Sequence, residues 1–312
     1  MHQTVLLPEA VAALVTERDG YYVDGTFGRG GHSREILSVL GAGGHLLAVD
    51  KDLQAIEVAR LIQENETRFD FEHGSFAQLP HQLRRRGIEA VDGILLDLGV
   101  SSPQLDEGAR GFSFLQDGPL DMRMDTSSGM TAAQWLATVK HGDLARVLRE
   151  DGEERYAGRI ASAILRAREK EPLQTTAQLA QVVAAANPKW EQHKHPATRA
   201  FQAIRIYINQ ELEDLEKLLG ESVELLGPGG RLVVISFHSL EDRLVKRFIR
   251  RMARGDELPA SVPVREQDLN RRLRPIGKAV RPGTEEIAAN TRARSAIMRV
   301  AEKLPVSGST HR

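Results

Sequence analysis

One stretch of the sequence, 92–106, combines a carboxylate with hydroxyl side chains in a pattern that suits chemistry on a bound substrate. It opens with an apolar run typical of a strand buried on both faces. Asp97 interrupts that run, and Ser101, Ser102 and Pro103 then predict a loop in place of a helix start. Ligands of open parallel sheets bind beyond the carboxyl ends of the strands. The stretch therefore predicts a substrate-binding edge, although an isolated Asp that caps a tight turn gives the same local pattern.

A glycine-rich turn earlier in the chain is the second candidate site. It follows an expected strand, 21–24, and precedes an expected helix, 33–40. Glycine permits positive φ and lets a ligand lie against bare backbone. Asp50 closes the next expected strand about 20 residues later, where a carboxylate can hold two ribose hydroxyls. Together these features predict an adenosine-type cofactor. The glycines of the turn are Gly25, Gly28, Gly30 and Gly31.

The charge beside this turn distinguishes between two adenosine cofactors. A dinucleotide presents its pyrophosphate to the helix that begins near Ser33, where the acidic Asp24 repels it. S-adenosylmethionine instead places a cationic sulfonium over the glycine turn, near the strand that ends at Asp97. We therefore favour a methyltransferase over a dehydrogenase. Phe76, just past the third expected strand, either flanks the adenine or packs as a core aromatic, and local sequence does not separate these alternatives.

Methyl transfer from a sulfonium is an in-line displacement, so catalysis comes largely from positioning the donor and the acceptor. The chain has no cysteine, which closes the covalent thiolate route to pyrimidine carbon and leaves nitrogen or oxygen as the acceptor. If the acceptor is an amine, a nearby base can take its proton, for a gain of roughly 10²–10⁴-fold. The candidates are Asp97, the Ser101 and Ser102 oxygens, and the backbone carbonyls beside Pro103.

The elements that position these residues alternate between strand and helix. This alternation predicts an α/β, Rossmann-like fold with a mostly parallel sheet. An alternating segment, 295–301, is expected to return as an antiparallel strand. The expected parallel strands are 21–24, 45–50, 69–72, 92–97 and 231–237.

The middle of the chain has a different pattern. No strand is expected between about 104 and 196, where helices follow one another and capping boxes begin at Thr131 and Thr175. We therefore expect a helical insertion, 105–196, inside a discontinuous methyltransferase domain, 1–104 and 197–312. Beyond the insertion, we expect one long helix with apolar residues from Phe201 to Leu219.

Composition limits the class of protein. The chain has 312 residues, 41% hydrophobic and 27% charged, as in ordinary globular proteins of about two domains. The absence of cysteine excludes disulfides and thiolate metal sites and suits a reducing cytoplasm. No apolar run approaches the roughly 18 residues of a membrane span. His193 and His195 lack further metal-ligand spacing. We expect a cytoplasmic protein with no metal and no membrane partner.

Charge is uneven along the chain. The net charge is −1, yet 243–299 holds fifteen Lys and Arg against six Asp and Glu. This excess indicates a polyanionic partner, or equally a solvated basic helix face.

Longer runs of sequence carry a resemblance to a known family. The chain resembles the bacterial ribosomal RNA small subunit methyltransferase H (MraW) family, which methylates the N4 amine of a cytidine in 16S rRNA. The resemblance implies that 16S rRNA, the small ribosomal subunit or its precursor is the partner. The S-S-P-Q run is also similar to the S/D-P-P-Y/W loop of amino-methylating DNA enzymes. The matching runs are 24–33, 92–106, 110–125, 195–206, 229–246 and 292–302.

The resemblance also implies roles for particular residues. The helical insertion is implied to hold the RNA, and the oligomeric state stays open, with a homodimer as one candidate. A cofactor contact at Asp97 competes with its role as the base. The implied cofactor-contacting positions are Gly30, Gly31, His32, Asp50, Phe76, Asp97 and Gln104.

Other residues are open to two interpretations. His238 follows the fifth expected strand at the same edge as Asp97. Base recognition is a minority hypothesis for it, and a helix cap at Ser239 explains this segment sufficiently. Phe112, Phe114 and Met122 could stack on a flipped base, but a core at the domain junction fits them better. A basic scaffold that binds RNA without chemistry is the non-enzyme alternative. The intact glycine turn and ribose-binding carboxylate argue against it.

Overall fold

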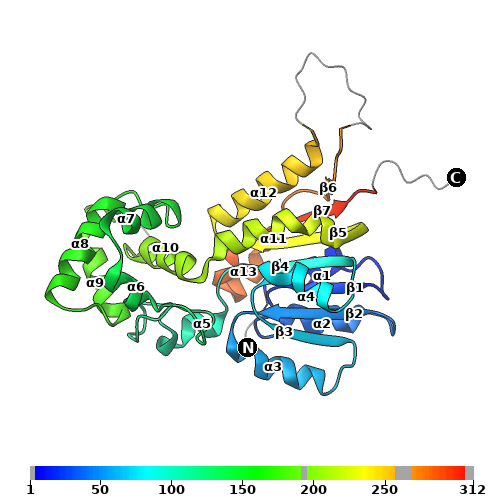
Figure 1. Cartoon of the computed structure of the whole chain (residues 1–312), viewed down its shortest axis with the longest axis horizontal. Coiled ribbons are helices and arrows are strands. Elements are labelled where there is room, and N and C mark those ends of the chain that lie inside the picture. Colours follow the sequence, from blue (N-terminus) through cyan, green and yellow to red (C-terminus); the bar gives the residue numbers. More distant parts are fainter. Residues whose placement is uncertain (1–3, 191–194, 257–268, 306–312) are drawn as a thin grey trace, which may run out of the picture. The chain divides into compact units, whose positions relative to one another are not determined.

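The computed structural model describes residues 4–190, 195–256 and 269–305. Its internal contacts divide the chain into two compact units (Figure 1). The first, here called the sheet unit, comprises Met1–Gly99 and Leu212–Arg312, and the second, the helical unit, comprises Val100–Glu211. Most of the segment 258–274 lies outside the described residues.

The described part of the sheet unit contains a seven-stranded sheet in the order β3-β2-β1-β4-β5-β7-β6. β1 to β5 are mutually parallel, while β7 runs antiparallel to both β5 and β6. The expected parallel sheet and its antiparallel return are confirmed. Only β6 was not expected, because three residues are too few to show a period. The strands are β1 Tyr21–Asp24, β2 His45–Asp50, β3 Phe69–His73, β4 Val91–Asp97, β5 Leu226–Ser236, β6 Leu273–Pro275 and β7 Ile297–Lys303.

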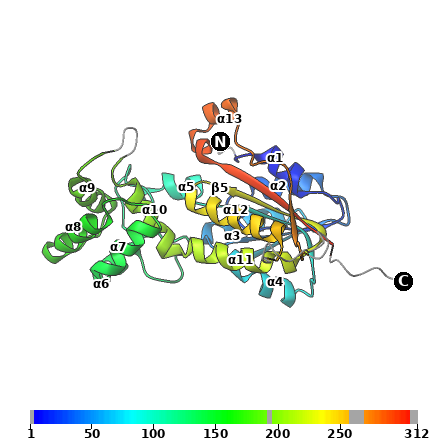
Figure 2. The ribbon, with the colours of Figure 1, turned by 90° about the horizontal axis from the view of Figure 1, so that it is seen from above.

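Helices cover both faces of this sheet because successive strand residues point to opposite sides. In β1, Tyr22 packs in one apolar cluster with Leu14 of α1 and Ile36 of α2. Its neighbour Val23 packs in the other cluster, which includes Leu215 of α11. Figure 2 shows α11 and α12, both of this second cluster, side by side. The helices are α1 Leu7–Leu14, α2 Gly31–Val39, α3 Leu53–Gln63, α4 Leu79–Arg85, α11 Glu211–Leu225, α12 Ser239–Arg254 and α13 Thr284–Ala289, with short 3₁₀ turns η1 Phe76–Gln78 and η4 Thr291–Ser295.

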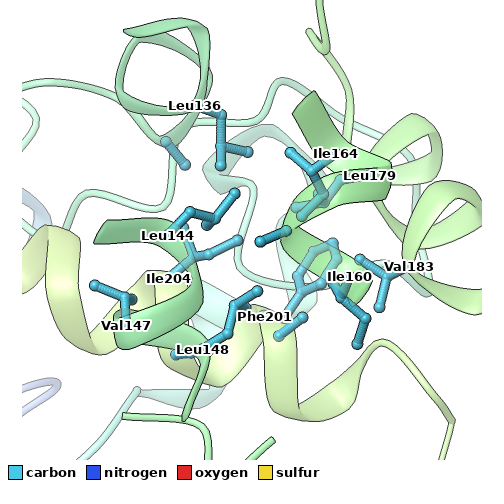
Figure 3. Packing of buried hydrophobic residues seen from close by; sticks show 14 of the residues in the cluster. Leu136, Leu144, Val147, Leu148, Ile160, Ile164, Leu179, Val183, Phe201 and Ile204 are labelled. Atoms are coloured by element: carbon cyan, nitrogen blue, oxygen red, sulfur yellow. The ribbon is translucent and has the colours of Figure 1, made fainter. Parts of the chain in front are cut away.

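The helical unit has an apolar core of its own. Side chains from α6 to α10 meet in it, among them Leu136, Leu144, Ile164, Val183 and Phe201 (Figure 3). The expected capping boxes at the starts of α6 and α9 are confirmed. The helices are α5 Ser102–Asp106, α6 Ala132–Thr138, α7 His141–Glu150, α8 Ala157–Lys170, α9 Thr176–Ala186 and α10 Thr198–Asn209, with a 3₁₀ turn η2 Gly108–Arg110.

The single long helix expected up to Leu219 was wrong, because the chain forms two helices, α10 and α11. Gln210 separates them in the left-handed conformation, with φ 54 and ψ 38. The apolar period continues across the break, but the two halves bury their side chains in different cores. Phe201 packs in the core of the helical unit, whereas Leu219 packs against the sheet. In the described part of the chain, no helix combines the length and apolar character needed to cross a membrane.

Candidate active site

The turn after β1 holds glycines in conformations that residues with a Cβ rarely adopt. Gly28 has φ 55 and Gly30 has φ 72. A Cβ on Gly28 would meet nothing within 4 Å, so its backbone faces open space. At Gly25 a Cβ would lie 2.6 Å from Leu96 Cδ2 and 3.2 Å from Phe76 Cβ. The turn therefore presents bare backbone, and it brings the aromatic side chain after β3 next to the end of β1.

Asp50 lies beside this turn, as the sequence predicted. Its Oδ2 accepts a 2.6 Å hydrogen bond from the Gly28 N–H, and its Oδ1 accepts one of 2.8 Å from the Asp52 N–H. Burial raises the pKa of Asp50, while these two N–H groups act in the opposite direction. A carboxylate offers about four lone-pair sites. Asp50 can therefore fix the turn and still accept hydrogen bonds from a ligand.

Asp24 is the most deeply buried acid at this edge, with no exposed surface. Its Oδ2 accepts a hydrogen bond from Ser33 Oγ at 2.7 Å, and its Oδ1 accepts one from the Thr26 N–H at 3.1 Å. Burial raises the pKa of Asp24 to about 6 in spite of these bonds. A carboxylate held this way supplies negative charge beneath the turn at neutral pH.

Asp97 and His32 face each other at the end of β4. The Asp97 N–H donates to Thr26 Oγ1 at 2.6 Å, which ties this strand end to the glycine turn. His32 Nδ1 lies 3.6 Å from Asp97 Oδ2, too far for a hydrogen bond. Within the described residues, Asp97 Oδ1 and His32 Nε2 are buried atoms without a hydrogen-bond partner. Buried polar atoms are normally satisfied, so these two orphaned atoms indicate a site for a ligand.

Both of these side chains have shifted pKa values. Burial raises the pKa of Asp97 well above its usual range, and the charges of Asp24 and Glu241 raise it further. Burial lowers the pKa of His32 to about 4, against a smaller opposing effect of the Val5 backbone. His32 is therefore neutral at physiological pH and supplies no positive charge to the acids around it.

His238 precedes α12 and lies close to Glu241, a residue that the sequence did not single out. Glu241 Oε2 accepts from the Phe237 N–H at 2.8 Å and the His238 N–H at 3.2 Å. His238 Nε2 also lies 3.0 Å from Glu241 Oε1. His238, not Ser239 as expected, is the N-cap of α12. The acid three residues after the cap fits a capping box, and this spacing is the signal that could have found Glu241.

Four carboxylates thus gather where β1, β2, β4 and β5 end. Asp50 raises the pKa of Asp24, and Asp24 and Glu241 raise that of Asp97, so their charges act on one another. Such an edge favours a cation and disfavours a pyrophosphate. Open glycine backbone, a ribose-type acceptor and orphaned polar atoms fit a cationic adenosine cofactor. The described residues contain no group of three or more His, Asp or Glu that could hold a metal ion.

Ser101, Ser102, Pro103 and Gln104 lie in the helical unit, and the loop expected at 101–103 was wrong. These residues begin α5, with Ser101 as its N-cap. The Gln104 side-chain Oε1 accepts from the Ser101 N–H at 2.9 Å, which stabilises the start of the helix. Pro103 is tolerated because N–H groups of a first helical turn have no intrahelical partner. The buried Gln104 therefore has a structural role in addition to any contact with a ligand.

Comparison with known proteins supports the resemblance found in the sequence. The model of the MraW methylase family matches residues 1–304. Ribosomal RNA small subunit methyltransferase H of Nitrosomonas europaea is 57% identical over 319 residues, covering 100% of both chains. The protein of the same name from Legionella pneumophila strain Paris is 55% identical over 304 residues, covering 97% of this chain and 99% of its own. Fibrillarin of Aeropyrum pernix, solved with S-adenosyl-L-methionine, covers 95% of this chain and 73% of its own, but a TM-score of 0.40 at 9% identity adds no argument. The chain belongs to the MraW methylase family.

Proposed function

We propose that this protein transfers a methyl group from S-adenosylmethionine to the N4 amine of a cytidine in 16S rRNA. Relatives at 55% and 57% identity over nearly their whole length are named as small subunit rRNA methyltransferases. The observation that carries the proposal is the acid-rich edge where Asp50 meets the glycine turn beside the orphaned Asp97 Oδ1. A dehydrogenase would have to hold a pyrophosphate against the buried charge of Asp24. We infer that the protein acts in the cytoplasm.

The cofactor contacts follow from the chemistry of each group. Asp50 accepts from the ribose hydroxyls, because a carboxylate at the end of the second strand serves this purpose in nucleotide-binding sheets. Phe76, beside Gly25, flanks the adenine. Asp97 and His32 present their orphaned atoms to the methionine portion of the cofactor. We assign the remaining contacts to Gly30, Gly31 and Gln104.

The transfer needs positioning more than covalent help. When bound, S-adenosylmethionine supplies an electrophilic methyl carbon. The amine nitrogen would attack that carbon with its lone pair, and the electrons of the carbon–sulfur bond would remain on sulfur. The nitrogen then carries a positive charge and loses one proton. Ser101, Ser102 and Pro103 orient the amine, and the proton goes to Asp97 or to one of the oxygens at 101–103. Base recognition by His238 has less support than the roles above, because capping of α12 already explains the position of this residue.

The RNA partner fits the exposed basic face of α12. Arg243, Lys246, Arg247, Arg250 and Arg251 are exposed on this helix, and Lys and Arg supply most of the salt-dependent affinity for phosphate backbones. We assign the helical unit to RNA recognition. A scaffold without chemistry would bind RNA in the same salt-dependent way, so cofactor binding and methyl transfer are what separate an enzyme from it.

The test measures transfer of labelled methyl to small-subunit RNA and to immature particles, with mass spectrometry of the nucleosides. Label in N4-methylcytidine is expected. Asp97→Ala should reduce turnover at least about 100-fold, whereas Asp70→Ala, on β3 and 41% exposed, should not. Calorimetry measures S-adenosylmethionine binding separately. Label in another nucleoside, robust Asp97→Ala activity or absence of cofactor binding would each count against the proposal.

A further inference from the structure

A pocket of about 420 Å³ opens within the helical unit among residues to which the proposed reaction assigns no role. This volume lies in the range of about 300–1,000 Å³ that is typical of small-molecule sites. The pocket shares no residue with the candidate active site. Aromatic, cationic and acidic side chains line it together, including Glu154, Arg155, Tyr156, Lys189, Trp190 and His195.

A series of aromatic rings connects the core of the helical unit to this pocket. Phe201 is buried in the core, and its ring centroid lies 5.0 Å from that of Phe114. The Phe114 ring centroid lies 4.5 Å from that of His195, with the planes tilted by 30°, and the His195 ring lies 6.1 Å from Trp190, tilted by 52°. Trp190 is 61% exposed, one of few large apolar side chains on the described surface. The inner rings are anchored by packing, and the exposed face of Trp190 gives a surface on which a planar base can stack, with the tilted His195 ring beside it.

Two exposed cations stand at the same pocket. Arg155 and Lys189 are exposed, and the Arg155 guanidinium lies 5.6 Å from the centre of the Tyr156 ring. A guanidinium held over an aromatic ring is already oriented, and Arg and Lys are the side chains that most often contact phosphate. Rings and cations side by side match the base and the phosphate of one nucleotide.

One buried carboxylate gives the pocket a preference among bases. Glu154 is 4% exposed, and its Oε1 accepts a 2.9 Å hydrogen bond from the Tyr156 N–H. A carboxylate accepts several hydrogen bonds and donates none. It can therefore receive the exocyclic amine of cytosine, adenine or guanine, while the carbonyl oxygens of uracil would repel it.

We propose that this site, the Trp190 pocket, holds one unpaired, amino-bearing nucleotide of the RNA substrate. Its base stacks on Trp190 with His195 beside it, its phosphate contacts Arg155 and Lys189, and its amine donates to Glu154. The inference rests on the proposed RNA substrate and adds a recognition site to it. Single-stranded RNA bases are commonly read by stacking and by their hydrogen-bonding edges in this way.

Tryptophan fluorescence reports directly on the pocket because the chain has only two tryptophans. Trp135 is 4% exposed within the core, so Trp135→Phe leaves Trp190 as the reporter. Titration with five-nucleotide oligo(C) or oligo(A) should quench this signal saturably, and oligo(U) should bind at least about fivefold more weakly. Glu154→Gln, which replaces one carboxylate oxygen with an NH₂ donor and removes the charge, should weaken or remove that preference. Absence of saturable quenching would refute nucleotide binding in the Trp190 pocket. Equal affinity for oligo(U) would refute the role of Glu154 in base preference.

Methyl transfer to small-subunit particles gives the second readout. Trp190→Ala should raise the KM for particles by about 5- to 150-fold, with a smaller change in kcat and unchanged S-adenosylmethionine affinity. Trp190→Phe should restore most of the loss. Leu61→Ala removes an exposed apolar side chain of α3 in the sheet unit (62% exposed) and should leave KM unchanged. An unchanged KM in Trp190→Ala, with full wild-type transfer, would refute the pocket and leave the proposed function standing. Absence of wild-type transfer to rRNA would refute the proposed function first.

Discussion

Asp24 permits a quantitative test of how the acidic edge affects the fold. Its carboxylate is fully buried beneath the glycine turn, and burial raises its pKa from 3.8 to about 6. The substitution Asp24→Asn removes the charge and keeps the shape. The amide oxygen can still accept from the Thr26 N–H, and the amide nitrogen can donate to Ser33 Oγ in place of accepting from it. The main difference between the two proteins is then one buried negative charge.

The size of the effect follows from the pKa. An acid whose pKa is higher in the folded state destabilises the fold when it is ionised, so stability falls as pH rises from 3.8 to 6. At 1.36 kcal/mol per pKa unit, the full effect is about 3 kcal/mol above that window. Near pH 5 about half of it is present. Asp24→Asn should therefore be more stable than the wild type, by about 3 kcal/mol near pH 8 and by about half as much near pH 5.

Hydrogen exchange with mass spectrometry on peptides from 21–40 measures this effect in the sheet unit itself. Both tryptophans of the chain lie in the helical unit. Tryptophan emission therefore reports mainly on the helical unit and not on the sheet unit, where Asp24 lies. Comparison of the variant and the wild type at one pH cancels the intrinsic pH dependence of exchange. Where the segment recloses faster than it exchanges, protection should rise about 100-fold near pH 8 and about 10- to 20-fold near pH 5.

Two comparisons make the result interpretable. His32 acts in the opposite direction, because its pKa of about 4 makes stability rise with pH toward 6.5, but it is present in both proteins and cancels. Asp143→Asn, on an exposed residue of α7, should leave exchange of the same peptides unchanged. Equal protection of Asp24→Asn and wild type at both pH values, or a loss of protection that does not vary with pH, would refute the reasoning.

Three further substitutions test the fold and the site. Gln210→Gly should stabilise the chain by about 1 kcal/mol, because it relieves the left-handed strain between α10 and α11. Glu216→Gly, inside α11, should destabilise the chain by a similar amount. Urea unfolding measures both changes. Leu144→Ala should destabilise the helical unit by about 2–5 kcal/mol in urea unfolding followed by Trp135 fluorescence; a loss no larger than that of the exposed Leu115→Ala would contradict its place in the core. Asp50→Asn should weaken S-adenosylmethionine binding at least about tenfold by calorimetry, since the amide has fewer acceptor sites for ribose; unchanged affinity would remove its ribose-binding role.

The parallel sheet and the contact between Asp50 and the glycine turn could be predicted because they depend on local patterns. Buried strands show as continuous apolar runs. The glycine turn follows β1 and Asp50 ends β2, and these two strands are parallel neighbours in the sheet. The structure accordingly places Asp50 Oδ2 2.6 Å from the Gly28 nitrogen. α4, α13 and β6 were not predicted, because elements of three to seven residues carry too little periodicity.

The remaining features depend on tertiary structure. The break at Gln210 carries no glycine or proline, and it is visible only once Phe201 and Leu219 are seen in different cores. Ser101 to Pro103 predicted a loop, but Ser and Pro also begin helices, and Gln104, which accepts from the Ser101 N–H, stabilises the helix start. Glu241 has an ordinary position in a first helical turn. Its importance comes from the end of β5, which lies next to the end of β4 and brings the Glu241 charge to bear on Asp97.

The acidic edge links the stability of the fold to the proposed function. Burial raises the pKa of Asp24, Asp50 and Asp97, so each of these carboxylates destabilises the protein when ionised, and the charges of Asp24 and Glu241 raise the pKa of Asp97 further. A cationic cofactor has the opposite effect, because it favours the charged form of every acid around it. Binding should therefore lower the pKa of Asp24 and Asp97 and release protons, and affinity should fall as pH drops below about 6. Asp24→Asn should therefore raise the stability of the protein and lower its affinity for the cofactor. The buried negative charge of Asp24 destabilises the free protein, and the same charge favours binding of a sulfonium.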